Sequence, residues 1–223
     1  VYRKGEVLYM TEEMIEQVVE AFGQAALQSK TCGFDMCMIH AGHGWLIHQF
    51  LSPTTNHRTD RFGGSLENRY RFAAEIVRAI KRACGDDFPV SIRYSVESKT
   101  KGLRQGALPG EQFVEAGRDM AESIEAARYL ADAGCDMFNC DNGTYDAWYW
   151  AHPPIYMPKN CNLDDVAELR RHIDVPVVCA GRMEPADAAA AIAEKRIDAA
   201  GFARPFFACL LYTSPSPRDM RRS

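Results

Sequence analysis

The sequence predicts an α/β fold built around a parallel sheet. Five short apolar runs alternate with segments whose apolar residues recur at helical spacing, an order typical of parallel sheets. Glycine or proline stands at most of the junctions and marks where one element ends and the next begins. The chain has 223 residues, 47% of them hydrophobic, which suits one globular domain.

The first predicted helix covers 12–29. Thr11 is a suitable N-cap, and acidic residues follow it in the first turn. One face of this helix is apolar, at Met14, Val18, Phe22 and Ala25. Gly33 ends the helix, and the apolar run after it, Phe34 to Ile39, is predicted to be a buried strand.

The second predicted helix begins after Ser65 as N-cap and stops at Gly85. Its apolar face consists of Leu66, Tyr70, Ala73, Val77 and Ile80. Pro89 then leads into a strand over 90–94. The segment 97–110 is rich in Lys, Arg and Gly, and we predict a mobile loop there.

The remaining elements keep the alternation. A helix over 118–133 ends at Gly134 and precedes a strand over 136–140. Residues 141–162 form a long predicted loop rich in aromatic residues, and loops of this length inside compact domains are usually functional. A helix, a strand, a helix and a last strand follow, over 163–173, 175–180, 185–195 and 197–202.

Charge and cysteine usage narrow the class of protein. The net charge is -4 and the pI about 5.9, which disfavours a nucleic-acid binder. No apolar run reaches the length of a membrane span, so no membrane partner is expected. The eight cysteines include no Cys-x-x-Cys pair, so we predict no metal site and a cytoplasmic location. Cys37, Cys140 and Cys179 lie in strand-like runs and are expected to be inert core thiols.

Reactive and aromatic side chains follow the first predicted strand, at His40, His43 and Trp45. Catalytic groups of α/β folds lie at the C-terminal ends of strands, so chemistry is expected here. Spaced blocks follow in a fixed order, at His40–Leu46, Gln49–Pro53, Asn56–Asp60, Phe62–Ser65 and Glu67–Arg69. Together these blocks resemble the signature of the Old Yellow Enzyme family of flavin-dependent ene reductases. In this comparison Asn56, Arg58 and Asp60 hold the loop and do not react.

The resemblance implies a fold more specific than a parallel sheet. It aligns the five predicted strands with about strands 4 to 8 of a TIM (β/α)8 barrel, with the earlier strands upstream of Val1. Because Val1 is not an initiator Met, we expect a fragment of a longer chain. The partial barrel is expected over 1–209. The segment 210–223 lacks an apolar period and carries prolines, so a non-native or disordered tail is expected.

The same resemblance assigns a cofactor and two catalytic donors. It implies FMN at the barrel mouth, with NAD(P)H as the electron donor. His40 and His43 match the pair that donates hydrogen bonds to the substrate carbonyl oxygen, where negative charge develops. The alternative is that one of them is a structural histidine. Arg93 matches the residue beside the flavin's pyrimidine ring, and its alternative is an ion pair with a carboxylate.

A phosphate site is implied after the last two predicted strands. Gly181 and Arg182 follow one strand, and Ala203 and Arg204 follow the other. Barrels of this class bind phosphate there through backbone N–H groups, and an arginine adds a fork of donors. The family usually has Gly at the position of Ala203, a mild departure because Ala keeps its N–H.

Trp45 departs from the family pattern in a way that affects the chemistry. Most members carry Tyr there to protonate the substrate, and an indole N–H is too weak an acid for this. The similar branch uses a second relay residue in the loop after the sixth strand, which places Tyr145 in that role, with an exposed loop tyrosine as the equal alternative. Trp45 and Trp148 are predicted to contact substrate. Trp148, Tyr149, Trp150 and His152 either line a pocket for a bulky apolar substrate or form a self-packed loop cluster.

The expected function is hydride transfer from NAD(P)H, through FMN, to the activated C=C bond of an enone or enoyl substrate. The resemblance is strongest to the branch of 2,4-dienoyl-CoA, 2-enoate and bile-acid 3-oxo-Δ4-steroid reductases. Any iron–sulfur cluster or FAD would belong to a missing C-terminal part. Two alternatives stay open: a flavin-free phosphate-binding lyase or isomerase, and an inactive fragment of the reductase. The substrate, the choice of NADH or NADPH and the oligomeric state are not predicted.

Overall fold

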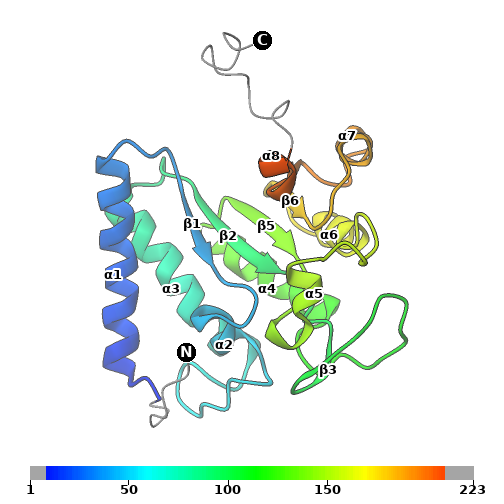
Figure 1. Cartoon of the computed structure of the whole chain (residues 1–223). Helices are drawn as coiled ribbons and strands as arrows, with labels where there is room; N and C mark the ends of the chain where they lie inside the picture. Colours follow the sequence, from blue (N-terminus) through cyan, green and yellow to red (C-terminus); the bar gives the residue numbers. More distant parts are fainter. Residues whose placement is uncertain (1–8, 209–223) are drawn as a thin grey trace.

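A computed structural model describes residues 9–208. Five parallel strands form one sheet in the order β1 (Cys37–His40), β2 (Val90–Ser95), β5 (Met137–Asp141), β6 (Val177–Ala180) and β7 (Ala199–Gly201). Order in the sheet follows order in the chain, and helices run between successive strands (Figure 1). This is part of a (β/α)8 barrel, as predicted.

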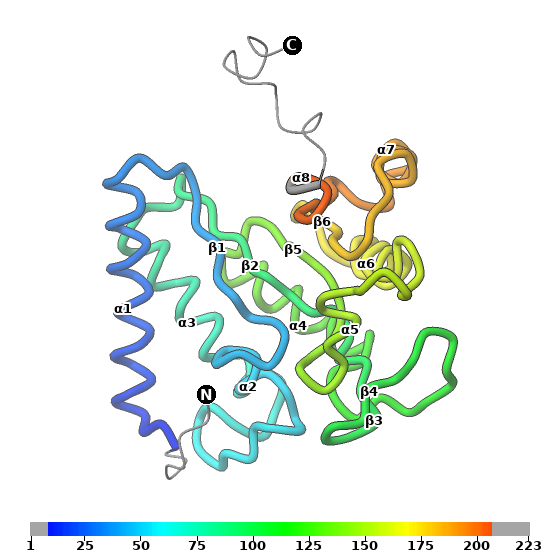
Figure 2. The backbone as a smooth tube through the Cα atoms, viewed as in Figure 1, coloured from blue at the N-terminus to red at the C-terminus, as the bar shows by residue number. Residues whose placement is uncertain are grey.

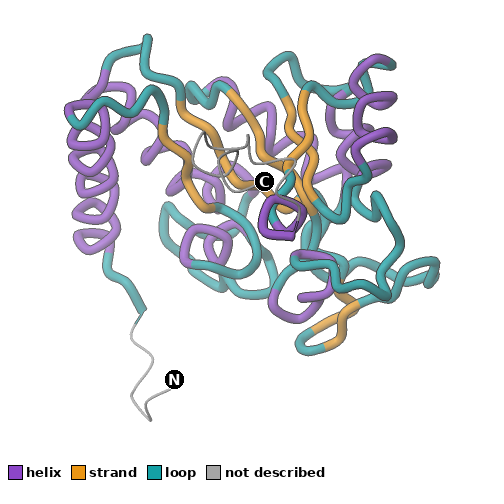
Figure 3. Tube along the Cα trace, turned by 45° about the horizontal axis from the view of Figure 1, so that its top comes forward, coloured by secondary structure: helices purple, strands orange, loops and turns teal. Residues whose placement is uncertain are grey.

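The larger helices lie along the outside of the sheet (Figure 3). They are α1 (Glu12–Thr31), α3 (Leu66–Cys84), α4 (Met120–Asp132), α6 (Leu163–Arg170) and α7 (Pro185–Ala193). Two predicted caps are confirmed: Thr11 Oγ1 accepts the Met14 N–H at 3.2 Å, and Ser65 Oγ accepts the Asn68 N–H at 3.3 Å. Short helices complete the chain: α2 (Leu46–Leu51), the 3-10 turn η1 (Tyr145–Ala147), α5 (Trp148–Ala151) and α8 (Arg204–Ala208).

Helix α1 packs on α3, but not through the predicted face. Its buried residues are Ile15, Val19, Gly23 and Ala26, each one position after a predicted one. Gly23 allows this approach, since a Cβ there would lie 3.2 Å from the Ala79 carbonyl oxygen of α3. The helix has apolar residues on two adjacent stripes, and the neighbouring helix decides which stripe is covered.

The prediction of a buried first strand was wrong. Within residues 34–40 only Ile39 is buried, whereas Phe34 is 65% exposed and Met38 is 55% exposed. Strand β1 lies at one end of the sheet order and, within residues 9–208, pairs only with β2. An apolar run can therefore form a strand with one face uncovered by the described residues.

The two predicted loops contain more structure than expected. The segment 97–110 includes an antiparallel hairpin of β3 (Thr100–Gly102) and β4 (Gln105–Gly106), which lies beside the α5 region in Figure 2. Lys99 anchors this hairpin, since its Nζ lies 2.5 Å from a Glu97 oxygen and 2.7 Å from an Asp165 oxygen. The hairpin is therefore tied to the body of the protein, and a loop without secondary structure was the wrong prediction for 100–106.

Two further findings concern the sequence predictions. Within residues 9–208, no helix combines the length and apolar character needed to cross a membrane. Cys140 and Cys179 are fully buried as predicted, while Cys37 is only partly buried. The predicted tail, 210–223, lies outside the described residues.

Candidate functional site

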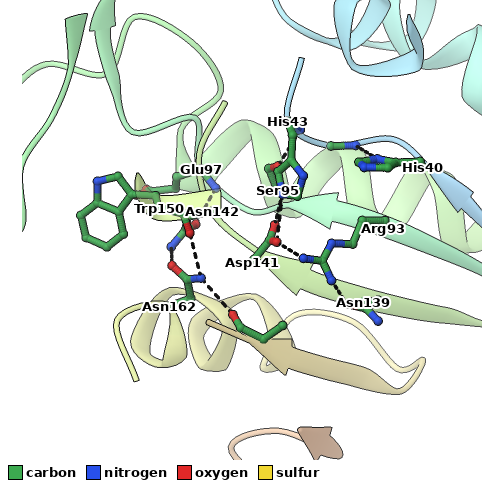
Figure 4. A network of polar contacts seen from close by, with 12 residues as sticks. His40, His43, Arg93, Ser95, Glu97, Asn139, Asp141, Asn142, Trp150 and Asn162 are labelled. Carbon is green, nitrogen blue, oxygen red and sulfur yellow. Dashed lines mark hydrogen bonds and ion pairs between the residues drawn. The ribbon is translucent and has the colours of Figure 1, made fainter. Parts of the chain in front are cut away.

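The C-terminal ends of the parallel strands bring polar side chains to one edge of the sheet. His40 ends β1 and is in register with Arg93 of β2, which is in register with Asn139 of β5. Asp141 ends β5 two residues later. Figure 4 shows these side chains converging above the strands, together with His43 from the turn after β1.

Asp141 is the centre of this group. Its carboxylate is 1% exposed and accepts hydrogen bonds from His43 Nε2 at 2.8 and 2.9 Å. Arg93 forms an ion pair with the same carboxylate through Nη2 and donates from Nη1 to Asn139 Oδ1 at 2.7 Å. A buried carboxylate is tolerated only when it is paired and hydrogen-bonded, and Asp141 meets both conditions.

The two predicted catalytic histidines are neighbours but are used differently. Their rings lie 5.2 Å apart and nearly perpendicular. His43 is buried, and its Nε2 is engaged by Asp141. His40 is exposed, and its Nδ1 accepts the Gly42 N–H at 3.3 Å, which leaves Nε2 as the protonated nitrogen of the neutral ring. Burial of part of the ring, and then the nearby His43, lower the pKa of His40, which favours that neutral form.

The turn after β1 fixes His43 in place. His43 has a φ of 60°, in the left-handed region, and its backbone N–H donates to Ser95 Oγ at 3.1 Å. Gly42 lets the turn approach β2, because a Cβ there would lie 2.8 Å from the same Ser95 oxygen. The histidine is thus held by both its backbone and its ring.

Aromatic rings continue from the histidines into the loop after β5. We call Trp45, Tyr145, Trp148 and His152 the aromatic cluster. The ring centroids of Trp45 and Tyr145 lie 5.5 Å apart, those of Tyr145 and Trp148 4.9 Å apart and stacked, and those of Trp148 and His152 4.2 Å apart. His152 also lies 5.8 Å from the His43 ring. The structure therefore gathers the predicted catalytic and substrate residues in one place.

A cavity of about 320 Å³ lies beside this cluster. We call it the arginine pocket. All the residues predicted to bind the cofactor line it, namely Arg93, Gly181, Arg182, Ala203 and Arg204. His152 and Asn139 line it too, and no Asp or Glu is among its lining residues. Three guanidinium groups line the pocket; Arg93 is paired with Asp141, and Arg182 and Arg204 make the pocket suited to an anion.

The arginines of this pocket are also anchored to the loop after β5. Arg204 Nη2 donates to the Pro153 carbonyl oxygen at 2.7 Å. Arg182 Nη1 donates to the Ile155 carbonyl oxygen at 2.5 Å and to that of Met157. The guanidinium of Arg182 therefore already has backbone partners within the protein. Arg182 would act on a ligand through its backbone N–H and through its positive charge.

The aromatic loop separates into two packed parts. Trp148 and His152 belong to the aromatic cluster. Trp150 is 7% exposed and packs with Ala147 and Met157 in a small core of its own. Trp150 Nε1 and the Tyr149 hydroxyl both donate to the Ala107 carbonyl oxygen, at 2.7 and 3.0 Å, and so hold the segment that follows the hairpin.

Sequence reasoning missed Asp141 and Asn139 as members of the site. Both lie in the last part of β5, at the start of the motif Asn139-Cys-Asp-Asn-Gly, and both contact Arg93. A charged residue directly after an apolar strand was the available signal. It could have been paired with Arg93, for which a carboxylate partner was expected as an alternative.

Comparison with known proteins agrees with this geometry. Residues 3–209 match the model of the NADH:flavin oxidoreductase / NADH oxidase family. The chain is 49% identical over 201 residues to cinnamate reductase of Clostridium sporogenes, covering 89% of this chain and 30% of that protein. It is 34% identical over 190 residues to NADH oxidase of Thermoanaerobacter brockii, covering 85% of this chain and 27% of that protein.

A solved structure leads to the same family. The complex of 2-naphthoyl-CoA reductase with 2-naphthoyl-CoA superposes with a TM-score of 0.74 at 32% identity, covering 89% of this chain and 28% of that one. The chain thus spans less than a third of the length of these relatives. The matched residues nevertheless include every strand of the sheet and both parts of the site. The chain belongs to the NADH:flavin oxidoreductase family, whose members include the Old Yellow Enzymes.

Proposed function

We propose that the protein binds FMN in the arginine pocket and reduces the activated C=C bond of an α,β-unsaturated carbonyl compound, with NAD(P)H as electron donor. The observation that carries the proposal is the contact between the two halves of the site. Arg93 and His152 line the pocket, and both also belong to the group of histidines, Asp141 and aromatic rings. A cofactor in the pocket would therefore adjoin the side chains suited to act on a substrate.

The chemistry of the pocket fits a flavin mononucleotide. The phosphate is an anion, and Arg204 with the backbone of Gly181 and Ala203 would hold it where two strands end. Arg93 would face the ring system and favour negative charge there, while Asp141 and Asn139 fix the direction of its guanidinium. Gly181 has a φ of 129°, a backbone conformation that glycine adopts far more readily than other residues.

When bound, FMN supplies the hydride. The chain's own contribution is to orient the substrate and to stabilise charge on its carbonyl oxygen. His40 donates from Nε2–H to that oxygen, and it does so as a neutral ring because its pKa is lowered. His43 lies 5.2 Å from the His40 ring and is held by Asp141, so that the surroundings of the donor are fixed before the substrate arrives.

Tyr145 is the proposed proton donor. Trp45 occupies the position where most family members carry a phenol, and the ring of Tyr145 lies next to it, 5.5 Å away. Tyr145 stacks on Trp148 and is 53% exposed. Trp45 and Trp148 would form apolar walls for a flat substrate. A flat substrate is supported by the 49% identical relative, which is named for the reduction of cinnamate.

The flavin-free alternative receives no support from the buried lysine of this region. A lyase with a Schiff base needs an uncharged amine. Burial lowers the pKa of Lys99, but the carboxylates of Asp165 and Glu97 outweigh it and the pKa is raised above its usual value. Lys99 therefore stays charged and paired, which suits a structural anchor and not a nucleophile.

The proposal is tested by the visible absorption spectrum of the purified chain, recorded before and after addition of FMN and desalting. We expect retained yellow colour in the wild type and its loss in Arg204→Ala. Arg196→Ala is the matched control, since Arg196 forms an exposed ion pair with Asp164 away from the pocket, and it should stay yellow. A wild-type chain with native circular dichroism that releases all its FMN would overturn the proposal.

A further inference from the structure

Asn162 lies directly beneath the turn at Gly181 and is fully buried. Its Nδ2 donates to the Ala180 carbonyl oxygen at 2.9 Å and to that of Trp150 at 3.4 Å. Its Oδ1 accepts from Asn142 Nδ2 at 3.1 Å (Figure 4). A single amide thus joins the end of β6 to the loop after β5.

The amide and the turn are shaped to each other. A Cβ at Gly181 would lie only 2.2 Å from Asn162 Nδ2, so the amide occupies the space that a side chain at 181 would need. Gly181 also has a φ of 129°, which L-residues rarely adopt. Glycine at 181 and asparagine at 162 are therefore two parts of one arrangement.

The same turn is held from its other side. Arg182 Nη1 donates to the carbonyl oxygens of Ile155 and Met157, and the Asn160 N–H donates to the Arg182 carbonyl oxygen at 3.0 Å. The segment 155–162 therefore contacts the turn through both backbone and side chains. Since Gly181 and Arg182 line the arginine pocket, the shape of that wall depends on this segment as well as on β6.

A second amide extends the network toward β2. Asn142 is also fully buried; its Oδ1 accepts the Glu97 N–H at 3.0 Å, and its Nδ2 reaches Asp165 at 2.7 Å. Asp165 in turn pairs with Lys99, the anchor of the hairpin. The loops that follow β2, β5 and β6 are thereby connected through two buried amides.

We propose that Asn162 is a positioning residue for the phosphate of the bound nucleotide. It holds the Gly181–Arg182 turn so that the turn's backbone forms one wall of the anion site. This inference rests on the proposed function, which assigns FMN to the pocket, and it adds a residue that does not line the cavity. The expected effect of losing it is specific to the phosphate, because the turn would contact the phosphate whereas Arg93 would face the ring system.

The experiment compares FMN with riboflavin, which has the same ring system and no phosphate. Binding to wild type, Asn162→Ala and Asn56→Ala is measured by flavin fluorescence. Asn56 is the matched control: it is buried, and its amide donates to the carbonyl oxygens of Phe50 and Phe62 at 2.6 and 2.7 Å, away from the pocket. We expect Asn162→Ala to weaken FMN binding about tenfold and to leave riboflavin binding unchanged. In Asn56→Ala the preference for FMN should stay as in the wild type.

Hydrogen exchange of the backbone amides at 180–183 gives a readout that needs no ligand. These amides should exchange faster in Asn162→Ala than in Asn56→Ala. A wild type that prefers FMN, with Asn162→Ala keeping the full preference, overturns the role of Asn162 and leaves the proposed function standing. A wild type that binds neither ligand overturns the proposed function. Unchanged exchange at 180–183 in Asn162→Ala then refutes the hold on the turn as well.

Discussion

Replacing Asp141 by Asn should destabilise the protein by roughly 2–3 kcal/mol. The carboxylate is 1% exposed and serves two partners, His43 Nε2 at 2.8 Å and the guanidinium of Arg93. Removing one member of a buried pair costs about 3–5 kcal/mol, because the other charge is left without compensation. Two features reduce this figure. The Arg93 side chain is 22% exposed, so water reaches part of it, and the amide oxygen of Asn can still accept one hydrogen bond.

Urea unfolding followed by circular dichroism measures the change. Asp87→Asn is the control, because Asp87 pairs with Lys30 at 3.2 Å while 82% exposed, and its loss should cost within about 0.5 kcal/mol. Thermal unfolding should agree, with a fall in Tm of about 5–10 °C for Asp141→Asn. If Asp141→Asn costs no more than the control, Asp141 is not the shared anion that holds Arg93 and His43, and the reasoning fails.

Three further changes test other parts of the structure. Burial, and then the positive charge of Arg118, lower the pKa of His48 well below its ordinary value. The contribution of neutral His48 to the unfolding free energy is therefore complete above pH ~6.5 and is lost as the pH falls below that value. His48→Leu should therefore flatten the loss of unfolding free energy between pH 7 and 5, by up to about 1.4 kcal/mol per pH unit, and parallel urea curves for both proteins would refute this. Gly181→Ala should cost about 1–3 kcal/mol in urea unfolding, given its φ of 129° and the 2.2 Å approach of its Cβ to Asn162; an unchanged midpoint would show that the turn relaxes freely. Ser65→Ala should cost about 1 kcal/mol by loss of the α3 cap, measured by the same method, and a neutral result would mean that the cap's 3.3 Å bond contributes nothing.

Elements with local signals were predictable from the sequence. Helix α3 is the clearest case: Ser65 caps it, Gly85 ends it, and Tyr70, Ala73, Val77 and Ile80 are buried as predicted. Helix α2 was missed because it spans only 46–51 and its N-cap, Trp45, makes no side-chain cap hydrogen bond. Residues 148–151 were read as loop because four residues starting at Trp148 carry too little periodicity to distinguish a short helix.

The site shows the same division between local and long-range information. His40, Arg93 and Gly181 stand at strand ends that can be located from the chain alone, and the structure brings them to one edge of the sheet. The role of Asp141 depends on the register of β5 against β2, where Arg93 faces Asn139. The fit of Asn162 to Gly181 depends on a loop returning to a strand end 19 positions later along the chain. Neither contact can be predicted from residues that are neighbours in the sequence.

The alternating burial of side chains along β1 has a consequence for the position of His40. Met38 and His40 point to the same, exposed face of this strand, and Ile39 between them points to the buried one. Side chains on a strand alternate with a period of two, so a slip of one residue in the pairing of β1 with β2 would bury His40 and expose Ile39. The cost of exposing Ile39 therefore protects the position of His40. The apolar preference of Ile39 therefore fixes the face on which His40 lies, and a conservative change at Ile39 should alter any activity that depends on His40.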